Sequence, residues 1–354
     1  MSRFLVKKHE DLTPYTPGEQ PRDMQYVKLN TNESPFPPSP KALAAMDEAL
    51  KASLRLYPDP AATDLIAALA EANGLKKEQV FVSGGSDEAL AYAFMAFCDE
   101  NCGLVCPDVT YGFYSATAAL LGIDLKRIPL REDYTVAVSD YAGAGRTIVL
   151  PNPNAPTGIL LPLADVRRLC YDNPENIVII DEAYIDFGGE SAVKLLPECE
   201  NLLVVQTFSK SRSLAGGRIG MAFGSEALIA DLNRMKFAMN PYDITRLSLA
   251  AAAAAVQDAA YFDACRSKIV ENRVYTVENL LSMGFTVLPS EANFVFAAPG
   301  VIGGETYYRE LKRRGVLVRW FAGARTENFV RVTIGTREQM DTFLAVTKDI
   351  LSEV

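Results

Sequence analysis

Histidine is almost absent from this chain of 354 residues, in which His9 is the only one. A Ser/His/Asp or Cys/His hydrolase, or a metal site with histidine ligands, would have to use this residue. His9 lies near the N-terminus, where we expect an exposed position on an extended arm. The composition therefore argues against both classes of site.

The chain also lacks a long apolar run and an excess of basic residues. Its longest run of small apolar residues, Leu249 to Val256, is far shorter than the roughly 20 residues that span a bilayer. The N-terminal segment has no apolar stretch of the length found in signal peptides. The net charge is −9, whereas a nucleic-acid-binding protein typically has a basic face. We therefore expect a cytoplasmic protein that binds neither a membrane nor nucleic acid.

The six cysteines show no clear pattern of a metal site or a disulfide framework. Cys98, Cys102 and Cys106 are spaced by fours, whereas zinc and iron–sulfur sites usually use tighter pairs and a fourth ligand. The three residues leave an apolar helix and enter a short strand, so their side chains point in different directions. We expect buried free thiols, which suit a reducing cytoplasm.

The order of apolar segments predicts an α/β fold with two domains. Strands and helices alternate over residues 80–225, and NIVIID and NLLVVQT are unbroken apolar runs of the kind buried on both faces of a parallel sheet. After a long helix at 258–283, the strands alternate apolar and polar residues more clearly, which predicts a one-sided α+β sheet that includes VLVRW as one strand. We expect an arm at 1–28, a large doubly wound, mainly parallel-sheet domain at 29–260, and a small C-terminal domain at 261–354.

Polar residues follow several of the predicted strands, at the sheet edge where open α/β sheets bind ligands. The sequence SGGSD at 83–87 opens a helix and could hold a phosphate, although such a turn is often only structural. Asp181 ends one strand, and Lys210 follows another. A lysine in an apolar cleft could form a Schiff base, and Arg218 could bind a phosphate.

Pyridoxal 5'-phosphate is the cofactor that needs all of these groups together. It requires a lysine for its aldehyde, a carboxylate for its pyridine nitrogen, donors for its phenolic oxygen and a site for its phosphate. An aromatic side chain usually covers its ring. The strand ends therefore indicate this cofactor more strongly than any single motif does.

Four motifs in order give a specific resemblance: PNPNAPTG, IIDEAY, SKSRSLAGGRIG and VRVTIGT. They resemble the fold-type I aminotransferases, a superfamily of enzymes that depend on pyridoxal phosphate. KLNTNESPFPPSP, RLYPDP and VLVRWF are similar to its histidinol-phosphate aminotransferase branch. The resemblance covers almost the whole chain. One departure is Ala155, where the family usually has asparagine, so the contact with the phenolic oxygen would fall to Asn154 or to Tyr184 alone.

The resemblance implies a role for each matching position. Lys210 would bind the aldehyde and move the substrate proton, Asp181 would pair with the ring nitrogen, and Tyr184 would donate to the phenolic oxygen. The residues implied for the cofactor phosphate are Gly85, Ser86 and Asp87 through their backbone, and Thr207, Ser209 and Arg218. Tyr111 would stack on the ring, and Tyr57 would reach the phosphate of a neighbouring subunit, which implies a homodimer. Arg331, Arg319 and Tyr15 would bind the substrate.

The implied reaction is L-histidinol phosphate with 2-oxoglutarate, giving imidazole-acetol phosphate and L-glutamate, a step of histidine biosynthesis. Aromatic amino-acid transamination and threonine-phosphate decarboxylation on the same fold are alternatives, because such selectivity rests on a few side-chain contacts. A non-catalytic binding protein on this fold is the alternative from another class. The presence of both Lys210 and Asp181 argues against it.

Overall fold

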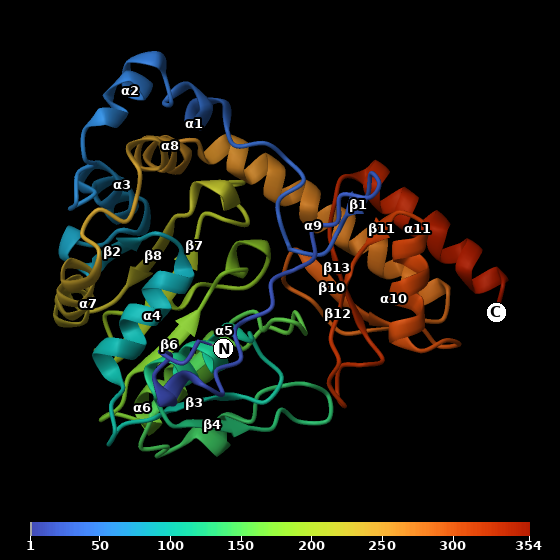
Figure 1. The fold of residues 1–354 in the computed structure, drawn as a ribbon, viewed down its shortest axis with the longest axis horizontal. Coiled ribbons are helices and arrows are strands. Elements are labelled where there is room, and N and C mark those ends of the chain that lie inside the picture. The colour runs from blue at the N-terminus through green and yellow to red at the C-terminus, as the bar shows by residue number, and fades with distance from the viewer. Residues whose placement is uncertain (1) are drawn as a thin grey trace.

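The computed structural model describes residues 2–354, which form two main sheets with helices packed on them (Figure 1). The larger sheet has seven strands in the order β2-β8-β7-β6-β5-β3-β4, and β8 alone runs antiparallel to its neighbours. Its strands are β2 (Val80–Ser83), β3 (Leu104–Pro107), β4 (Leu125–Ile128), β5 (Thr147–Pro151), β6 (Val178–Asp181), β7 (Leu202–Thr207) and β8 (Gly220–Phe223). The expected mainly parallel sheet is thus confirmed.

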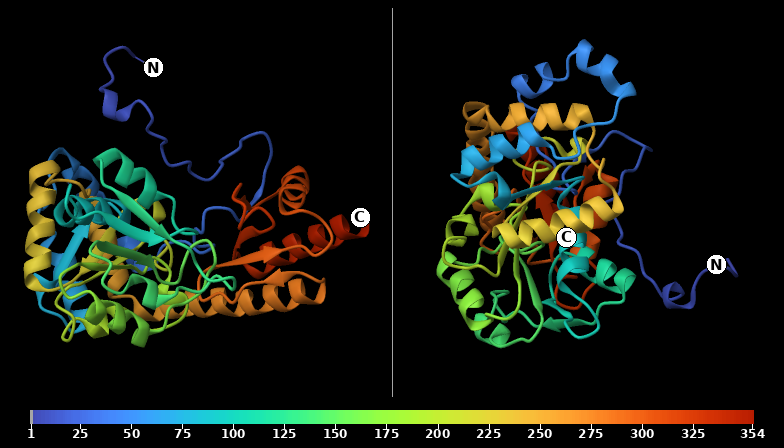
Figure 2. Two further views of the ribbon diagram at one scale, coloured as in Figure 1. Left: turned by 90° about the horizontal axis from the view of Figure 1, so that it is seen from below. Right: turned by 90° about the vertical axis from the view of Figure 1, so that its left-hand side faces the viewer.

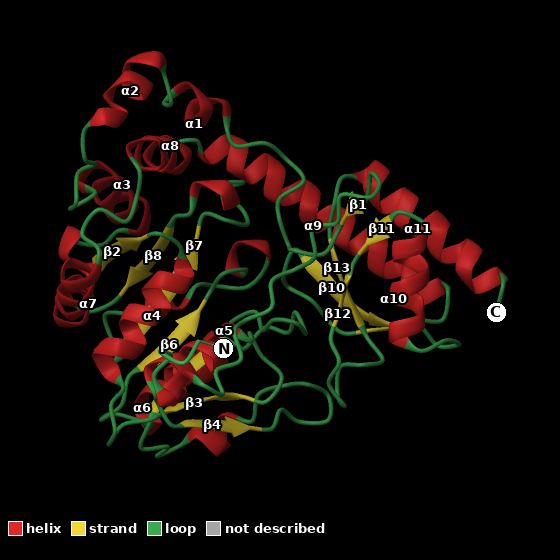
Figure 3. Cartoon of the chain, viewed as in Figure 1, coloured by secondary structure: helices red, strands yellow, loops and turns green. Residues whose placement is uncertain are grey.

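Helices cover both faces of the larger sheet (Figure 3). Successive residues of its central strands point to opposite sides, so each strand contributes side chains to two cores. Val178 and Ile180 of β6 belong to one core, whereas Ile179 belongs to the other. The first core contains α3 (Thr63–Asn73), α6 (Leu163–Asp172) and α8 (Arg246–Val256). The second contains α4 (Ser86–Phe97), α5 (Phe113–Leu121) and α7 (Glu226–Met239).

The smaller sheet is antiparallel and has the strand order β12-β13-β10-β9. Its strands are β9 (Thr286–Val287), β10 (Phe294–Ala298), β12 (Arg319–Trp320) and β13 (Val330–Thr333). The helices of this part are α9 (Ala259–Ser282), α10 (Gly304–Arg313) and α11 (Arg337–Ser352). The long helix α9 runs from the larger body toward the smaller one (Figures 1 and 2).

Two expectations for this smaller part were wrong. The sheet is not one-sided along β10, since Phe294, Val295 and Phe296 are all fully buried. Phe296 is covered by Phe329, with ring centroids 4.7 Å apart, because the chain between β12 and β13 folds back over that face. VLVRW is not one strand either: its first half pairs with the N-terminal arm and its second half pairs with β13.

The N-terminal arm crosses between the two bodies and joins the smaller one. Its strand β1 (Val27–Lys28) pairs in parallel with β11 (Val316–Leu317), while the first residues extend away from both sheets (Figure 2). Leu29, just after β1, lies in the core of the smaller part, and α9 begins near the expected second boundary. The helices α1 (Pro40–Ala44) and α2 (Glu48–Ala52) then lead into the larger body. The domain limits at 28/29 and 260/261 remain a prediction.

The six cysteines are free thiols, as expected, although Cys98 and Cys102 are only partly buried. Burial raises the pKa of the Cys98 thiol to about 11, so this side chain is protonated at neutral pH. Across residues 2–354, no helix has both the length and the apolar character needed to cross a membrane.

Candidate active site

A cavity of about 600 Å³ lies between the carboxyl ends of the larger sheet and the smaller sheet. The cavity brings together most of the predicted site residues. Those that line it are Tyr15, Ser86, Asp87, Tyr111, Asp181, Tyr184, Thr207, Ser209, Lys210, Arg218, Arg319 and Arg331. Three chain regions therefore meet here: the arm, the strand ends of the larger sheet, and the strands β12 and β13.

Lys210 lies three residues beyond the end of β7, and its amine points into this cavity. Its Nζ donates to the carbonyl of Thr31 at 3.2 Å and lies 5.8 Å from the centre of the Tyr184 ring. Burial and the nearby Arg331 guanidinium lower the pKa of Lys210 to about 8. A much larger share of this amine is therefore neutral, and able to attack an aldehyde, than for an ordinary lysine.

Asp181 ends β6 and is almost completely buried. Its Oδ2 accepts a hydrogen bond from the Tyr114 hydroxyl at 2.7 Å, and its Oδ1 accepts one from the Ala183 amide at 3.2 Å. Burial raises the pKa of Asp181 to about 6, so the carboxylate form predominates at neutral pH. Tyr114 was missed from the sequence, although it follows Tyr111 by three residues at the start of α5 and could have been found by that spacing.

Tyr184 connects the strand end to the N-terminal arm. Its hydroxyl accepts a hydrogen bond from Asn32 Nδ2 at 3.0 Å, and the backbone amide of Asn32 donates to Thr333 Oγ1 at 3.0 Å. Asn32 has a positive φ of 56°, a conformation that asparagine tolerates better than most residues. The segment just after the predicted arm, which contains Thr31 and Asn32, thus forms part of the cavity, and no role was predicted for either residue.

The predicted phosphate loop forms a cradle at the start of α4. Gly85 precedes the helix with a φ of 117°, and no side chain caps the first amides of α4, so these remain able to bind an anion. The cradle is tightly packed: a Cβ on Gly220 of β8 would lie 2.3 Å from the Ser86 amide nitrogen. Arg218 lies against Gly85, and its Nη2 is 3.9 Å from Asp87 Oδ2.

The hydroxyl groups beside this cradle are close enough to act together. Thr207 Oγ1 lies 3.0 Å from Ser209 Oγ and 3.1 Å from the Ser209 amide. The hydroxyl of Tyr111 donates to Asp87 Oδ1 at 3.1 Å, which holds the ring at the cavity wall. These donors, a guanidinium and a helix N-terminus form a site that fits a phosphate group.

Arg319 and Arg331 face each other across the strands β12 and β13. They are partners in the antiparallel register, and the centre of each guanidinium lies 5.5 Å from the centre of the Phe321 ring. Like charges directly opposite each other are unfavourable in a sheet, so this pair suits an anion placed between or beside them. Arg331 Nε is buried without a hydrogen-bond partner, so its N–H can donate to a ligand.

The arm holds the two arginines through its backbone. Arg319 donates to the carbonyls of Thr16 and Pro17 at 3.0 and 3.1 Å, and Arg331 Nη2 donates to the carbonyl of Asn30 at 3.1 Å. Tyr15 lies on the same arm and contacts the Tyr111 ring edge to face, with centroids 5.6 Å apart. This side of the cavity is therefore built largely from residues 15–30 and the smaller sheet.

Three predicted residues do not line the cavity: Gly85, which lies behind Arg218 at the start of α4, Asn154 and Tyr57. The amide nitrogen of Asn154 donates to the Val109 carbonyl at 3.1 Å and to Thr157 Oγ1 at 3.0 Å, and Ala155 lines the cavity in its place. Tyr57 is 74% exposed and stacks on Tyr242 with centroids 4.5 Å apart.

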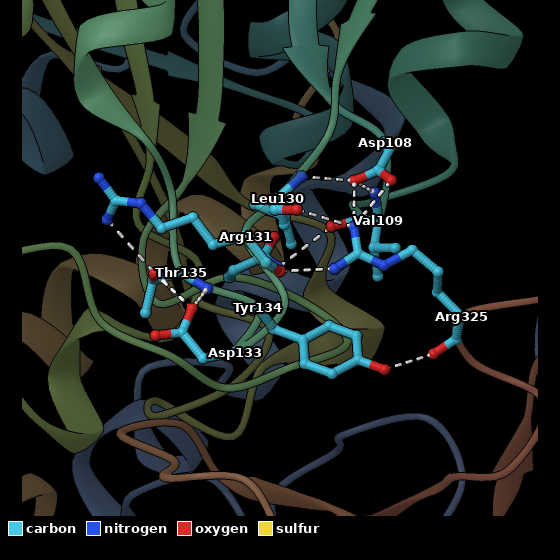
Figure 4. A network of polar contacts seen from close by, with 9 residues as sticks. Asp108, Val109, Leu130, Arg131, Asp133, Tyr134, Thr135 and Arg325 are labelled. Carbon is cyan, nitrogen blue, oxygen red and sulfur yellow. Dashed lines mark hydrogen bonds and ion pairs between the residues drawn. The ribbon is translucent and has the colours of Figure 1, made fainter.

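A polar network ties the chain between β12 and β13 to the larger body (Figure 4). Arg325 donates to Asp108 Oδ2 and to the Leu130 carbonyl, both at 3.0 Å, and to the Arg131 carbonyl at 2.6 Å. The Tyr134 hydroxyl donates to the carbonyl of Arg325 at 2.6 Å. The network therefore anchors the loop that also carries Phe321, and nothing local in the sequence indicated it.

Comparison with known proteins identifies relatives along the whole chain. The family model described as aminotransferase class I and II matches residues 24–346. Curated relatives include the histidinol-phosphate aminotransferases of Acetobacter pasteurianus and Clostridium acetobutylicum, which are 49% and 45% identical to this chain. The alignment with the first covers 99% of both chains, and that with the second covers 99% of this chain and all of the relative.

Solved structures show the same architecture. The histidinol-phosphate aminotransferase of Sinorhizobium meliloti, crystallised with pyridoxal-5'-phosphate, superposes with a TM-score of 0.85 at 25% identity and covers 93% of this chain and 92% of its own. Aspartate aminotransferase from Thermotoga maritima superposes with a TM-score of 0.80 at 20% identity, over 93% of this chain and 92% of its own, which shows the shared fold.

Proposed function

This chain belongs to the class I and II aminotransferases, and on that premise we propose that it transfers the amino group of L-histidinol phosphate to 2-oxoglutarate. The products are imidazole-acetol phosphate and L-glutamate, so an amino group and a carbonyl oxygen change places. The observation that carries the proposal is that Lys210 shares one cavity with the facing pair Arg319 and Arg331. Such a cavity suits an amine substrate with an anionic group.

Pyridoxal phosphate is the cofactor of the proposed reaction, and the residues present fit it. Its aldehyde accepts the amino group, and its protonated ring withdraws electrons from the substrate Cα. The groups that would hold its phosphate are Gly85, Ser86, Asp87, Thr207, Ser209 and Arg218. Tyr111 would cover the ring, and Tyr184 would donate to the phenolic oxygen, with no support from Asn154.

Lys210 and Asp181 supply the acid–base chemistry of the proposal. Because the pKa of Lys210 is lowered to about 8, its amine would be able to take up and hold the proton from the substrate Cα. Asp181, whose carboxylate form predominates at neutral pH, would pair with the ring nitrogen of the bound cofactor and favour its protonated form. Tyr114, hydrogen-bonded to Asp181, orients this carboxylate.

Arg331 and Arg319 hold the anionic groups of the substrates. Arg331 would bind a carboxylate of 2-oxoglutarate or the substrate phosphate, and Arg319 with Tyr15 would complete the phosphate site. This assignment favours histidinol phosphate over aromatic amino acids, whose rings require an apolar wall in place of a second cation. The full-length relatives with that name support the same choice.

We further propose a cytoplasmic homodimer of this chain in which Tyr57 reaches the neighbouring subunit's cofactor phosphate. Tyr57 lies outside its own cavity, on an exposed surface, and is held in place by Tyr242 and by Arg246, whose Nη2 donates to the Tyr57 carbonyl at 2.6 Å. An exposed but fixed tyrosine suits a contact made by a second copy.

A single half-reaction tests the proposal. Purified protein loaded with pyridoxal phosphate is mixed with L-histidinol phosphate without any keto acid, and the yellow absorption band of the cofactor is followed. Loss of the band is expected as the cofactor takes up the amino group. If the band responds to phenylalanine or to threonine phosphate, but not to histidinol phosphate, the proposed substrate is wrong and the compound that responds takes its place. A protein that cannot be loaded with the cofactor would overturn the proposal.

A further inference from the structure

An ion pair lies out of solvent behind the phosphate cradle. Lys236, on the last turn of α7, and Asp243 are joined by a distance of 2.8 Å between Nζ and Oδ1, and their side chains are only 3% and 2% exposed. A buried ion pair contributes little net stability, because the loss of hydration offsets the attraction. The further contacts of the two side chains therefore matter more than the pair itself.

Both side chains also bind the backbone at the start of the cradle. Lys236 Nζ donates to the carbonyl of Val82 at 2.9 Å, and Asp243 Oδ2 accepts from the amide of Gly84 at 3.0 Å. Glu88, in the first turn of α4, accepts from the same Gly84 amide at 2.8 Å. These charged side chains thus bind the backbone on both sides of Ser83, in the turn between β2 and α4.

The opposite side of the cradle is fixed by β8. Gly220 packs so closely that a Cβ there would lie 2.2 Å from the Gly85 carbonyl carbon, and Arg218 lies against Gly85. Ser83 adds a hydrogen bond from its hydroxyl to the Gly85 carbonyl at 3.0 Å. The Gly84–Gly85 backbone is therefore held between β8 and the buried pair, and no contact with an anion is needed to maintain its shape.

We propose that Lys236 and Asp243 are positioning residues that keep the Ser83–Asp87 loop in the shape that binds the cofactor phosphate. The inference rests on the proposed function, since it needs pyridoxal phosphate as the ligand. Groups behind a binding loop commonly set its geometry without touching the ligand. Gly84 and Gly85 have no side chains with which to hold this loop, so apart from the Ser83 hydroxyl the support comes from residues outside it.

The test compares pyridoxal phosphate with pyridoxal, which lacks the phosphate. Full-length protein freed of cofactor is titrated with each compound, and dissociation constants are obtained from the absorption of the bound form. For Lys236→Met and Asp243→Asn, we expect the dissociation constant for pyridoxal phosphate to rise by about tenfold, as when hydrogen bonds to an anion are lost. The constant for pyridoxal should stay within about twofold, because the remaining contacts are unchanged.

Control variants separate positioning from general stability. Glu291→Gln weakens another ion pair, with Arg273, on the side of the smaller sheet, and it should leave both dissociation constants unchanged. The double variant Lys236→Met with Asp243→Asn leaves no isolated buried charge, so it should fold even where a single variant does not. It should still show the selective loss of pyridoxal phosphate binding, because Val82 has lost its charged partner and Gly84 keeps only Glu88.

The outcomes distinguish this inference from the proposed function. A wild-type protein that binds neither compound overturns the proposed function, and the inference with it. A wild type that prefers pyridoxal phosphate, with variants that lose both compounds equally or neither, overturns the positioning role alone. Selective loss in the single and double variants supports it.

Discussion

The two walls of the cavity hold their charged groups in different ways. On the wall formed by the larger sheet, Asp181 has a hydrogen bond from Tyr114, and Arg218 is packed against Gly85 of the cradle. On the opposite wall, Arg319 and Arg331 bind only backbone carbonyls of the arm, and Arg331 Nε has no partner.

This difference suits the proposed roles of the two walls. We call the wall of the larger sheet the cofactor wall and the opposite one the substrate wall, after the ligands proposed for them. A cofactor that stays bound benefits from groups already fixed by their own partners, because little order is lost when it binds. The repulsion between two facing arginines is unfavourable in the absence of an anion, and their unpaired N–H groups can donate to one. Such a pair suits a substrate that enters and leaves. The following predictions test the comparison, in order of expected effect.

Replacing Lys210 with alanine should have the largest effect, because Lys210 is the only lysine among the described residues that line the cavity. We expect turnover to fall by about 10³-fold or more with every amino donor, as for the loss of a catalytic nucleophile and base. Lys194→Ala, which breaks a surface pair with Glu190, is the matched control and should keep full turnover. Substantial activity in the Lys210 variant would show that the reaction does not depend on this lysine.

The lowered pKa of Lys210 predicts how the cofactor-free protein reacts with pyridoxal phosphate at different pH. Only the neutral amine attacks an aldehyde, so the rate should rise by about tenfold per pH unit below the pKa of about 8 and level off above it. Stopped-flow absorbance from pH 6 to 9 measures it, with a free lysine derivative as the reference for the cofactor's own titration. A rate that still climbs at pH 9 would mean that burial does not activate this lysine.

The cofactor wall was largely predictable from the sequence, since its groups lie within short segments. Lys210 follows a buried strand, Asp181 ends another, and SGGSD opens a helix, so local patterns placed all three at one sheet edge. The larger sheet was predictable for the same reason, because strands buried on both faces appear as apolar runs.

The substrate wall and the supports behind the site were harder to predict, because they depend on contacts between distant residues. Asn32 reaches Tyr184 across 152 positions, and Lys236 binds Val82 across 154. The division of VLVRW between two sheets depends on pairing with β1, which no local pattern of polarity shows. Asn154 does not line the cavity, because its amide nitrogen donates to the Val109 carbonyl and to Thr157 Oγ1.

Replacing Arg319 with glutamine tests the substrate wall. We expect the KM for L-histidinol phosphate to rise by about tenfold, the loss of a charged hydrogen bond to phosphate, and the KM for glutamate to change by less than about threefold. The kcat should change little, because Lys210 and Asp181 are untouched. An equal rise in both constants would place the phosphate elsewhere in the cavity.

Arg325→Lys tests whether the substrate wall depends on its anchor to the larger body. Lysine can still pair with Asp108 but cannot reach the carbonyls of Leu130 and Arg131 at the same time. The pair is partly exposed, so the variant should lose less than about 1 kcal/mol of unfolding free energy. The KM for L-histidinol phosphate should rise by about threefold with kcat unchanged, because the loop that carries Phe321 is less fixed.

Tyr134→Phe is the matched variant for this anchor, since it removes the hydrogen bond to the Arg325 carbonyl and keeps the guanidinium contacts. It should change the KM less than Arg325→Lys does. If both variants lower the unfolding temperature and leave the KM for the phosphorylated amine unchanged, the anchor serves stability only. The facing arginines and the arm would then define the substrate wall alone, and the contrast with the cofactor wall would be sharper, because no contact with the larger body would be needed to position them.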